Sequence, residues 1–309
     1  MRILVVAAGS TGGYFGGRLA EAGRDVTFLV RPARAEHLRA YGLQIVSPHG
    51  DVTLRPRLVT AGDISDPFDV VLLTVKGFSL DTALCDMAPA VGPNTMILPV
   101  LNGMKHVDLL HARFGEKAVV GCVCKVATMV DDIGRIVQLS KPQELAYGEM
   151  NGMESPRIKQ LDVFMQGAGF DARLSPVIER EMWEKWVLLA TIGGATCLMR
   201  GNIGELEAAP GGADFVLRFF NEVVSVAKAV GRPPSEEFLA DTRALLTAKG
   251  STQASSMYRD MEKGRPIEAG QIIGDLLARG RQAKIPTPLL TVAYTHLVIY
   301  QARLPGGHP

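Results

Sequence analysis

A glycine-rich turn near the start of the chain has the residue types that bind the phosphates of a dinucleotide. The chain opens with the apolar run RILVV, and the turn that follows consists of Ala7, Ala8, Gly9, Ser10, Thr11 and Gly12. In turns of the G-x-G-x-x-G type, the glycines allow a tight bend, let backbone amides approach the pyrophosphate and pack the next helix closely. Gly9 and Gly12 hold the second and third glycine positions, whereas Ala7 replaces the first. Alanine costs least there if the bend does not require a positive φ.

The end of the next apolar run indicates which dinucleotide would bind. NAD-binding turns carry Asp or Glu about 20 residues after the glycines, where the carboxylate accepts hydrogen bonds from the ribose 2′-hydroxyl. Here the run DVTFLV is followed by Arg31, with Arg34 three residues later. A guanidinium binds phosphate bidentately, and a carboxylate would repel it. The sequence therefore predicts NADP(H), held through Arg31, and the alternative is a pair of solvated arginines in a loop.

Three further polar residues have positions that suit chemistry. Lys76 follows the run VVLLTV and Asn102 follows ILPVL, so both are expected at the carboxyl ends of strands, where open α/β sheets bind ligands. Lys185 stands between two tryptophans in an apolar stretch, where partial desolvation of its ammonium would favour proton donation. Glu181 lies four residues earlier, and from the residues alone a solvated ion pair of Glu181 with Lys185 on a helix is the favoured interpretation.

These residues need a parallel sheet to position them, and the first half of the chain predicts one. Short Val-, Leu- and Ile-rich runs alternate with helical patterns up to about residue 175, as is typical of strands covered on both faces. We expect a doubly wound Rossmann-type α/β domain over residues 1–175, with its sheet continuing through residues 136–175. An all-α domain is expected over 176–309, with helices over 178–199, 213–231, 235–248, 267–283 and 287–303.

Composition excludes several classes of partner. The 309 residues include 33 Lys plus Arg and 32 Asp plus Glu, and this balance argues against nucleic-acid and polybasic membrane binding. No apolar stretch approaches the roughly 20 residues that span a bilayer, and no secretory signal is present, so a cytoplasmic location is expected. The four cysteines and six histidines lack zinc-ligand spacing, so no metal is expected. Cys122 and Cys124 are expected to be small core residues.

An apolar face on the predicted helix over 213–231 has two interpretations. It either packs in the core of the helical domain or, if that domain leaves it uncovered, forms the interface of a homodimer. Its residues are Phe215, Val216, Phe219, Phe220, Val223, Val226 and Val230.

Several stretches together resemble ketopantoate reductases (2-dehydropantoate 2-reductases), over nearly the whole chain. The matching pieces are AAGSTGGYFGGRLAEAG, Arg31, TVKGFS, LPVLNGM, the pair Ala127-Thr128, MWEKW and SSMYRDMEKGRPIEAGQIIG. The resemblance implies an enzyme that reduces a 2-oxo acid with NADPH, by default 2-dehydropantoate to pantoate. It also implies a role for six residues: Lys76 and Asn102 along the cofactor, Asn102 also near the substrate, Ala127 on the cofactor through its backbone, Lys185 as general acid, Ser256 on a substrate hydroxyl, and Glu268 as a cofactor-side carboxylate.

The sequence departs from that family where the substrate would bind. The family usually presents asparagines four and eight residues after the catalytic lysine, and here those positions are Leu189 and Gly193. Lost hydrogen bonds change discrimination strongly, so a bulkier or less hydroxylated 2-oxo acid becomes the better candidate if the pocket is apolar. Two alternatives remain: a 3-hydroxyacid dehydrogenase-like or amine-forming reductase, and a non-catalytic NADP-sensing protein. Retention of Lys185 and Arg31 counts against the sensor.

Overall fold

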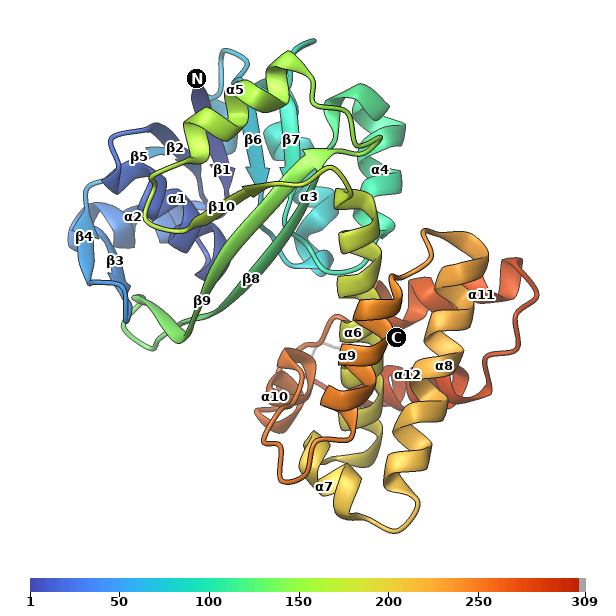
Figure 1. Ribbon diagram of the computed structural model, residues 1–309. Coiled ribbons are helices and arrows are strands. Elements are labelled where there is room, and N and C mark those ends of the chain that lie inside the picture. Colours follow the sequence, from blue (N-terminus) through green and yellow to red (C-terminus); the bar gives the residue numbers. More distant parts are fainter. Residues whose placement is uncertain (306–309) are drawn as a thin grey trace. The chain divides into compact units, whose positions relative to one another are not determined.

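The computed structural model of the protein describes residues 1–305, which divide into two compact units (Figure 1). Unit 1 contains residues 1–101 and 106–179, and unit 2 contains residues 102–105 and the chain from Arg180 onward. The two units divide after residue 179, close to the boundary expected at residue 175. The expected fold class, a Rossmann-type α/β domain followed by a helical domain, is confirmed.

Unit 1 is built around a five-stranded parallel sheet. Its strand order is β5-β2-β1-β6-β7, and each neighbouring pair is parallel. Ile3 and Val5 belong to the core on one face of this sheet, and Leu4 and Val6 to the core on the other, which explains the uninterrupted apolar run. The strands are β1 (Arg2–Val6), β2 (Asp25–Leu29), β5 (Arg57–Val59), β6 (Val70–Leu73) and β7 (Met96–Pro99). The accompanying helices are α1 (Ser10–Glu21), α2 (Pro32–Tyr41), α3 (Leu80–Met87) and α4 (Lys105–Phe114), with short 3-10 turns at Ala61–Asp63, Gly77–Ser79, Ala88–Ala90 and Glu116–Ala118.

The strands that follow residue 119 do not extend that sheet, so this prediction was wrong. Together with the earlier β3 and β4 they form a second sheet in the order β10-β9-β3-β4, with β8 paired to β9. After one bridge between Ile97 and Val119, the chain leaves the first sheet and β8 folds back on β9 in a long antiparallel hairpin. The strands are β3 (Leu43–Val46), β4 (Val52–Leu54), β8 (Val120–Val130), β9 (Ile136–Glu149) and β10 (Asp171–Leu174), with α5 (Pro156–Met165) between the last two.

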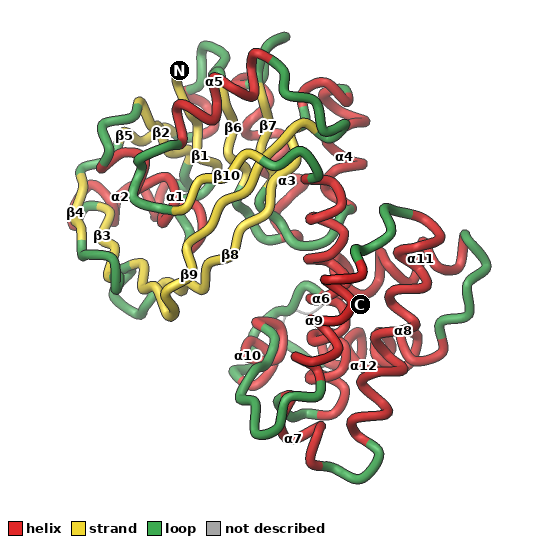
Figure 2. The backbone as a smooth tube through the Cα atoms, in the orientation of Figure 1, coloured by secondary structure: helices red, strands yellow, loops and turns green. Residues whose placement is uncertain are grey.

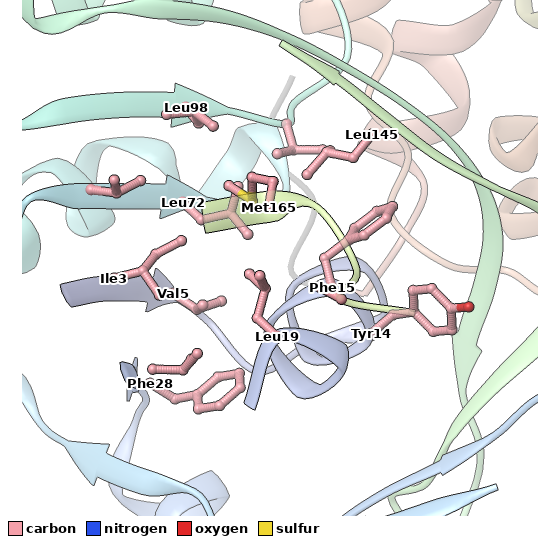
Figure 3. Close-up of a cluster of buried hydrophobic side chains, with 14 of the residues drawn as sticks. Ile3, Val5, Tyr14, Phe15, Leu19, Phe28, Leu72, Leu98, Leu145 and Met165 are labelled. Carbon is pink, nitrogen blue, oxygen red and sulfur yellow. The ribbon is translucent and has the colours of Figure 1, made fainter. Parts of the chain in front are cut away.

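Helix α1 lies between the two sheets and joins their cores. It contacts β1 and β2 of the first sheet and β3, β4, β8 and β9 of the second. Figure 3 shows Tyr14, Phe15 and Leu19 of this helix among side chains from both sheets. Cys122 is buried in the same cluster and Cys124 packs against it, so both are core residues as expected.

Unit 2 consists of helices and loops, without strands among its described residues (Figure 2). The five predicted helices are present, but two short ones were missed because six or seven residues carry too little periodicity. The elements are α6 (Ile178–Met199), which starts at the end of unit 1, α7 (Ile203–Ala208), α8 (Gly212–Val230), α9 (Glu236–Leu246), α10 (Ser256–Glu262), a π-helical turn (Gly270–Gly274), α11 (Asp275–Gln282) and α12 (Pro288–Ala302).

The apolar face of α8 is covered within unit 2. Val216, Phe219, Phe220, Val223 and Val226 are buried, and α8 contacts α7, α9, α11 and α12. Five of the seven predicted residues are therefore core residues, as the first interpretation expects, whereas Phe215 and Val230 are only half-buried. Among residues 1–305, no helix combines the length and apolar composition needed to cross a bilayer.

Candidate cofactor and catalytic site

The glycine-rich turn has a left-handed residue at its first position. Ala7 adopts φ +76°, its N–H donates to the carbonyl of Leu29 (3.0 Å), and its own carbonyl accepts from Thr74 Oγ1 (3.2 Å). Alanine is the least costly replacement only if the bend avoids positive φ, and this condition is not met. The chain therefore carries local strain of about 1 kcal/mol at the residue where the motif ordinarily has glycine.

Ala7→Gly is expected to stabilise the protein. Relief of the left-handed alanine exceeds the added flexibility of the unfolded chain, so the free energy of unfolding should rise by about 0.5 kcal/mol. Urea denaturation followed by circular dichroism measures the change. Ala8→Gly is the matched control: Ala8 is buried and has no positive φ, so this variant should lose stability. A less stable Ala7→Gly protein would contradict the interpretation of strain.

The two glycines of the turn have different roles. A Cβ at Gly12 would stand far inside van der Waals contact with the carbonyl oxygen of Ala7 and with Thr74 Oγ1, so the packing of α1 requires glycine. A Cβ at Gly9 would meet nothing within 4 Å, and its φ of −82° suits any residue. The fold itself therefore does not require Gly9, but an approaching ligand would.

The start of α1 fits an anion. Its first-turn amides have no partner within the helix, and no acidic side chain occupies that turn. With open space beside Gly9, Ser10 and Thr11 can present their N–H groups to a pyrophosphate at the positive end of the helix dipole.

Arg31 and Arg34 are not equivalent. Arg31 is exposed and occupies the N-cap position of α2 with an extended backbone, without a capping hydrogen bond from its side chain. Arg34 is half-buried, and its side chain donates to the carbonyls of Ala8 (Nε, 3.2 Å) and Gly134 (Nη1, 3.0 Å). Burial lowers the pKa of Arg34 from its usual value. Arg34 is therefore not a solvated loop residue, and that alternative was wrong for it. Its two hydrogen bonds connect the glycine-rich turn to the tip of the β8–β9 hairpin.

Two more predicted cofactor residues of unit 1 lie at irregular backbone. Lys76 is exposed three residues after the end of β6, the neighbour of β1, and its Nζ is 5.9 Å from the ring centre of the exposed Phe78. Ala127 lies where the β8–β9 ladder is interrupted, between the pairs Val126–Gln143 and Thr128–Gln138. It has no partner in that ladder, so its backbone could make a contact of the kind the resemblance implies.

In unit 2 the fold brings together two predicted residues that are 166 positions apart. Asn102 Nδ2 donates to Glu268 Oε2 at 3.4 Å, a long and therefore weak hydrogen bond. The next residue, Gly103, has φ +83°, and a Cβ there would be 2.7 Å from the carbonyl oxygen of Gln271 in the π-helical turn. The Asn102 loop thus packs on that turn, which the sequence did not predict. Such turns are frequent at functional sites.

Lys185 is half-buried on α6, and its neighbours fix the helix in place. Trp186 is buried and its Nε1 donates to the carbonyl of Ile272 (2.9 Å), which ties α6 to the π-helical turn. The Glu184 carboxylate accepts from the backbone N–H and the hydroxyl of Ser235, both at 2.8 Å. Glu184 therefore holds Ser235, the N-cap residue of α9, and the anchored Trp186 holds the Lys185 segment beside the turn that follows Glu268.

Ser256 is exposed at the first position of α10. The residue before it, Ser255, is buried and caps α10 by accepting from the N–H of Tyr258 (2.9 Å). The Ser255 hydroxyl also lies 3.2 Å from Thr196 Oγ1 on α6. The start of α10 therefore packs on α6, the helix that carries Lys185. Within residues 1–305, no three His, Cys, Asp or Glu side chains are grouped as a metal site.

Comparisons with known proteins cover nearly the whole chain. The family described as "Ketopantoate reductase PanE/ApbA" matches residues 3–152, and its "C terminal" counterpart matches residues 177–301. "Uncharacterized oxidoreductase YkpB" of Bacillus subtilis (strain 168) is 34% identical over 302 residues, which cover 98% of this chain and 99% of that protein.

Solved structures share the fold. The crystal structure of a 2-dehydropantoate 2-reductase from Geobacter metallireducens GS-15 matches with a TM-score of 0.85 at 29% identity, over 96% of this chain and 99% of that one. A ternary structure of a D-mandelate dehydrogenase with NADH and anilino(oxo)acetate matches with a TM-score of 0.84 at 20% identity, over 98% and 99%. At that identity the second likeness concerns the fold alone.

Proposed function

The chain belongs to the ketopantoate reductase PanE/ApbA family of nicotinamide-dependent oxidoreductases, which act on the CH–OH/C=O pair, and on that premise we propose that it reduces a 2-oxo acid with NADPH. One observation supports the proposal most. Asn102 and Glu268, distant in sequence, meet beside the π-helical turn that also anchors Trp186, the neighbour of Lys185.

The residues of unit 1 fit a dinucleotide phosphate. The amides of Ser10 and Thr11, the open space beside Gly9 and the absence of an acidic first turn would hold the pyrophosphate. Arg31 would bind the 2′-phosphate, while Lys76 and the backbone of Ala127 would bind along the cofactor. Asn102 and Glu268 would contact its ribose. When bound, NADPH supplies the hydride that adds to the carbonyl carbon.

The residues of unit 2 would then complete the reduction. Lys185 donates a proton from its ammonium to the oxygen of the developing alkoxide, so that the C=O group, a hydride and a proton become CH–OH. The Asn102 amide orients the carbonyl or the ribose. The exposed Ser256 hydroxyl holds the carboxylate or a hydroxyl of the substrate.

Steady-state oxidation of NADPH by the purified protein tests this function. The expected result is turnover with at least one member of a 2-oxo acid panel that includes 2-dehydropantoate. Reduction of NADP+ by 3-hydroxy acids, or oxidation of NADPH only when a carbonyl compound and an amine are supplied together, would support the alternative reductase class. Binding of NADPH without oxidation by any ketone, and unchanged binding in Lys185→Ala, would support the sensor instead.

Arg31→Ala is expected to weaken the binding of NADPH but not that of NADH. Loss of a charge-assisted contact with the 2′-phosphate should raise KM for NADPH about 10- to 100-fold, and KM for NADH should stay nearly constant. Arg57→Ala is the matched control, since Arg57 is an exposed arginine on β5 that pairs with Asp25 (2.8 Å). Equal effects of Arg31→Ala on both cofactors would remove Arg31 from the phosphate site.

A further inference from the structure

The face of α6 that carries Lys185 lacks hydrogen-bonding side chains over its next two turns. Residues four and eight positions later lie on the same side of a helix, and here they are Leu189, half-buried, and Gly193, buried. At 1.5 Å per residue, this row extends about 12 Å from Lys185. A substrate whose carbonyl oxygen reaches Lys185 therefore has an apolar surface to one side of it.

The space in front of Gly193 is filled by a thioether. The methyl carbon of Met257 lies 2.9 Å from the position that a Cβ at residue 193 would take, and Met257 is only 3% exposed. Met257 is the second residue of α10, which the Ser255–Thr196 contact holds against α6. The missing side chain at Gly193 is thus compensated by an apolar group and leaves no polar cavity.

The hydroxyls buried nearby are already engaged. Thr196 Oγ1 donates to the carbonyl of Ile192 (2.6 Å), and Thr191 Oγ1 donates to the carbonyl of Val187 (2.8 Å). The Ser255 hydroxyl caps α10. Burial raises the pKa of the adjacent Cys197 thiol to about 12, which keeps it neutral. These buried hydroxyls donate their protons within the protein, so none of them offers a donor to replace the water that a hydroxyl on the substrate side chain would lose here.

We propose that Leu189, Gly193 and Met257 form an apolar wall for the substrate side chain, and that the preferred substrates are 2-oxo acids with a branched hydrocarbon side chain rather than a hydroxylated one. The inference rests on the proposed function, because it takes Lys185 as the proton donor. Ser256, exposed beside Met257, then serves the carboxylate that every 2-oxo acid carries.

Two ketones that differ by one hydroxyl test the wall. They are 2-dehydropantoate and its deoxy analogue 3,3-dimethyl-2-oxobutanoate, compared by kcat/KM with NADPH. The deoxy ketone is expected to be favoured about tenfold or more, the discrimination that one unmatched polar group gives. A preference for 2-dehydropantoate would overturn the apolar wall. Absence of turnover with every 2-oxo acid would instead overturn the proposed function.

Substitution of Met257 tests whether the apolar wall causes the preference for the deoxy ketone. Met257→Gln keeps the length of the side chain and adds an amide, so the ratio of the two kcat/KM values should fall at least about fivefold toward the hydroxylated ketone. Met261→Gln is the matched control, since Met261 is equally buried one turn later on α10, and its ratio should stay unchanged. The ratio within one variant is independent of the fraction of folded protein. An unchanged ratio in Met257→Gln would refute the assignment.

Discussion

Lys185→Ala should lower kcat for ketone reduction about a thousandfold, within the 10²- to 10⁴-fold range of general acid catalysis. The proton that completes the alcohol would then have to come from water, which is neither positioned nor acidic enough to match an ammonium. KM for NADPH should change little, because the proposed cofactor contacts are made by other residues. Stopped-flow measurement of a single turnover isolates the reduction step from product release.

The matched control for this variant is the neighbouring residue. Glu184→Gln disturbs the cap of α9, where the carboxylate accepts two hydrogen bonds from Ser235, so it should lower stability by about 1 kcal/mol and leave kcat nearly unchanged. A Lys185→Ala protein that retains more than a tenth of the wild-type kcat would exclude Lys185 as the proton donor.

Gly12→Ala adds one methyl group and is expected to lower the stability of unit 1 strongly. The added Cβ would overlap Thr74 Oγ1, which can rotate away, and the carbonyl oxygen of Ala7, which is backbone and cannot. Separation of α1 from the strand costs about 3 kcal/mol as overpacking, so the urea midpoint should fall sharply or the protein should fail to fold.

Gly9→Ala is the counterpart with the opposite profile. Its Cβ enters open space at a backbone conformation open to alanine, so the free energy of unfolding should change by less than about 0.5 kcal/mol. NADPH affinity, measured by fluorescence titration, should nevertheless fall about tenfold, because the methyl group occupies the approach of the pyrophosphate. Equal stability losses in both variants, or unchanged NADPH binding by Gly9→Ala, would contradict this division of roles.

The first sheet could be predicted because its strands are buried on both faces. Runs such as RILVV contain no polar residue, and that pattern is typical of parallel strands between two layers. The second sheet could not be predicted in the same way. Strand β8 starts with an equally apolar run, but whether it extends the first sheet or folds back on β9 depends on a pairing partner, which periodicity does not report.

The site shows the same division. Strand ends located Lys76 and Asn102, since the carboxyl edge of a parallel sheet follows directly from the strand pattern. The contact of Asn102 with Glu268 depends on a π-helical turn that has no sequence signature, and α10 is too short to show where Met257 faces. An alanine at position 7 gives no hint of a left-handed backbone. The burial of Arg34 depends on Gly134, a hundred residues away.

Helix α1 is enclosed by both sheets of unit 1, and this enclosure has a thermodynamic consequence for the ligand. A phosphate at the proposed site beside Ser10 and Thr11 would meet amides whose orientation the core already fixes, because Tyr14, Phe15 and Leu19 of the same helix are fully buried. Binding would then involve no ordering of the helix, so its entropy loss would be confined to the ligand and nearby exposed side chains. The conformational entropy needed to order α1 is lost when unit 1 folds, so it would not be subtracted from the affinity for a cofactor.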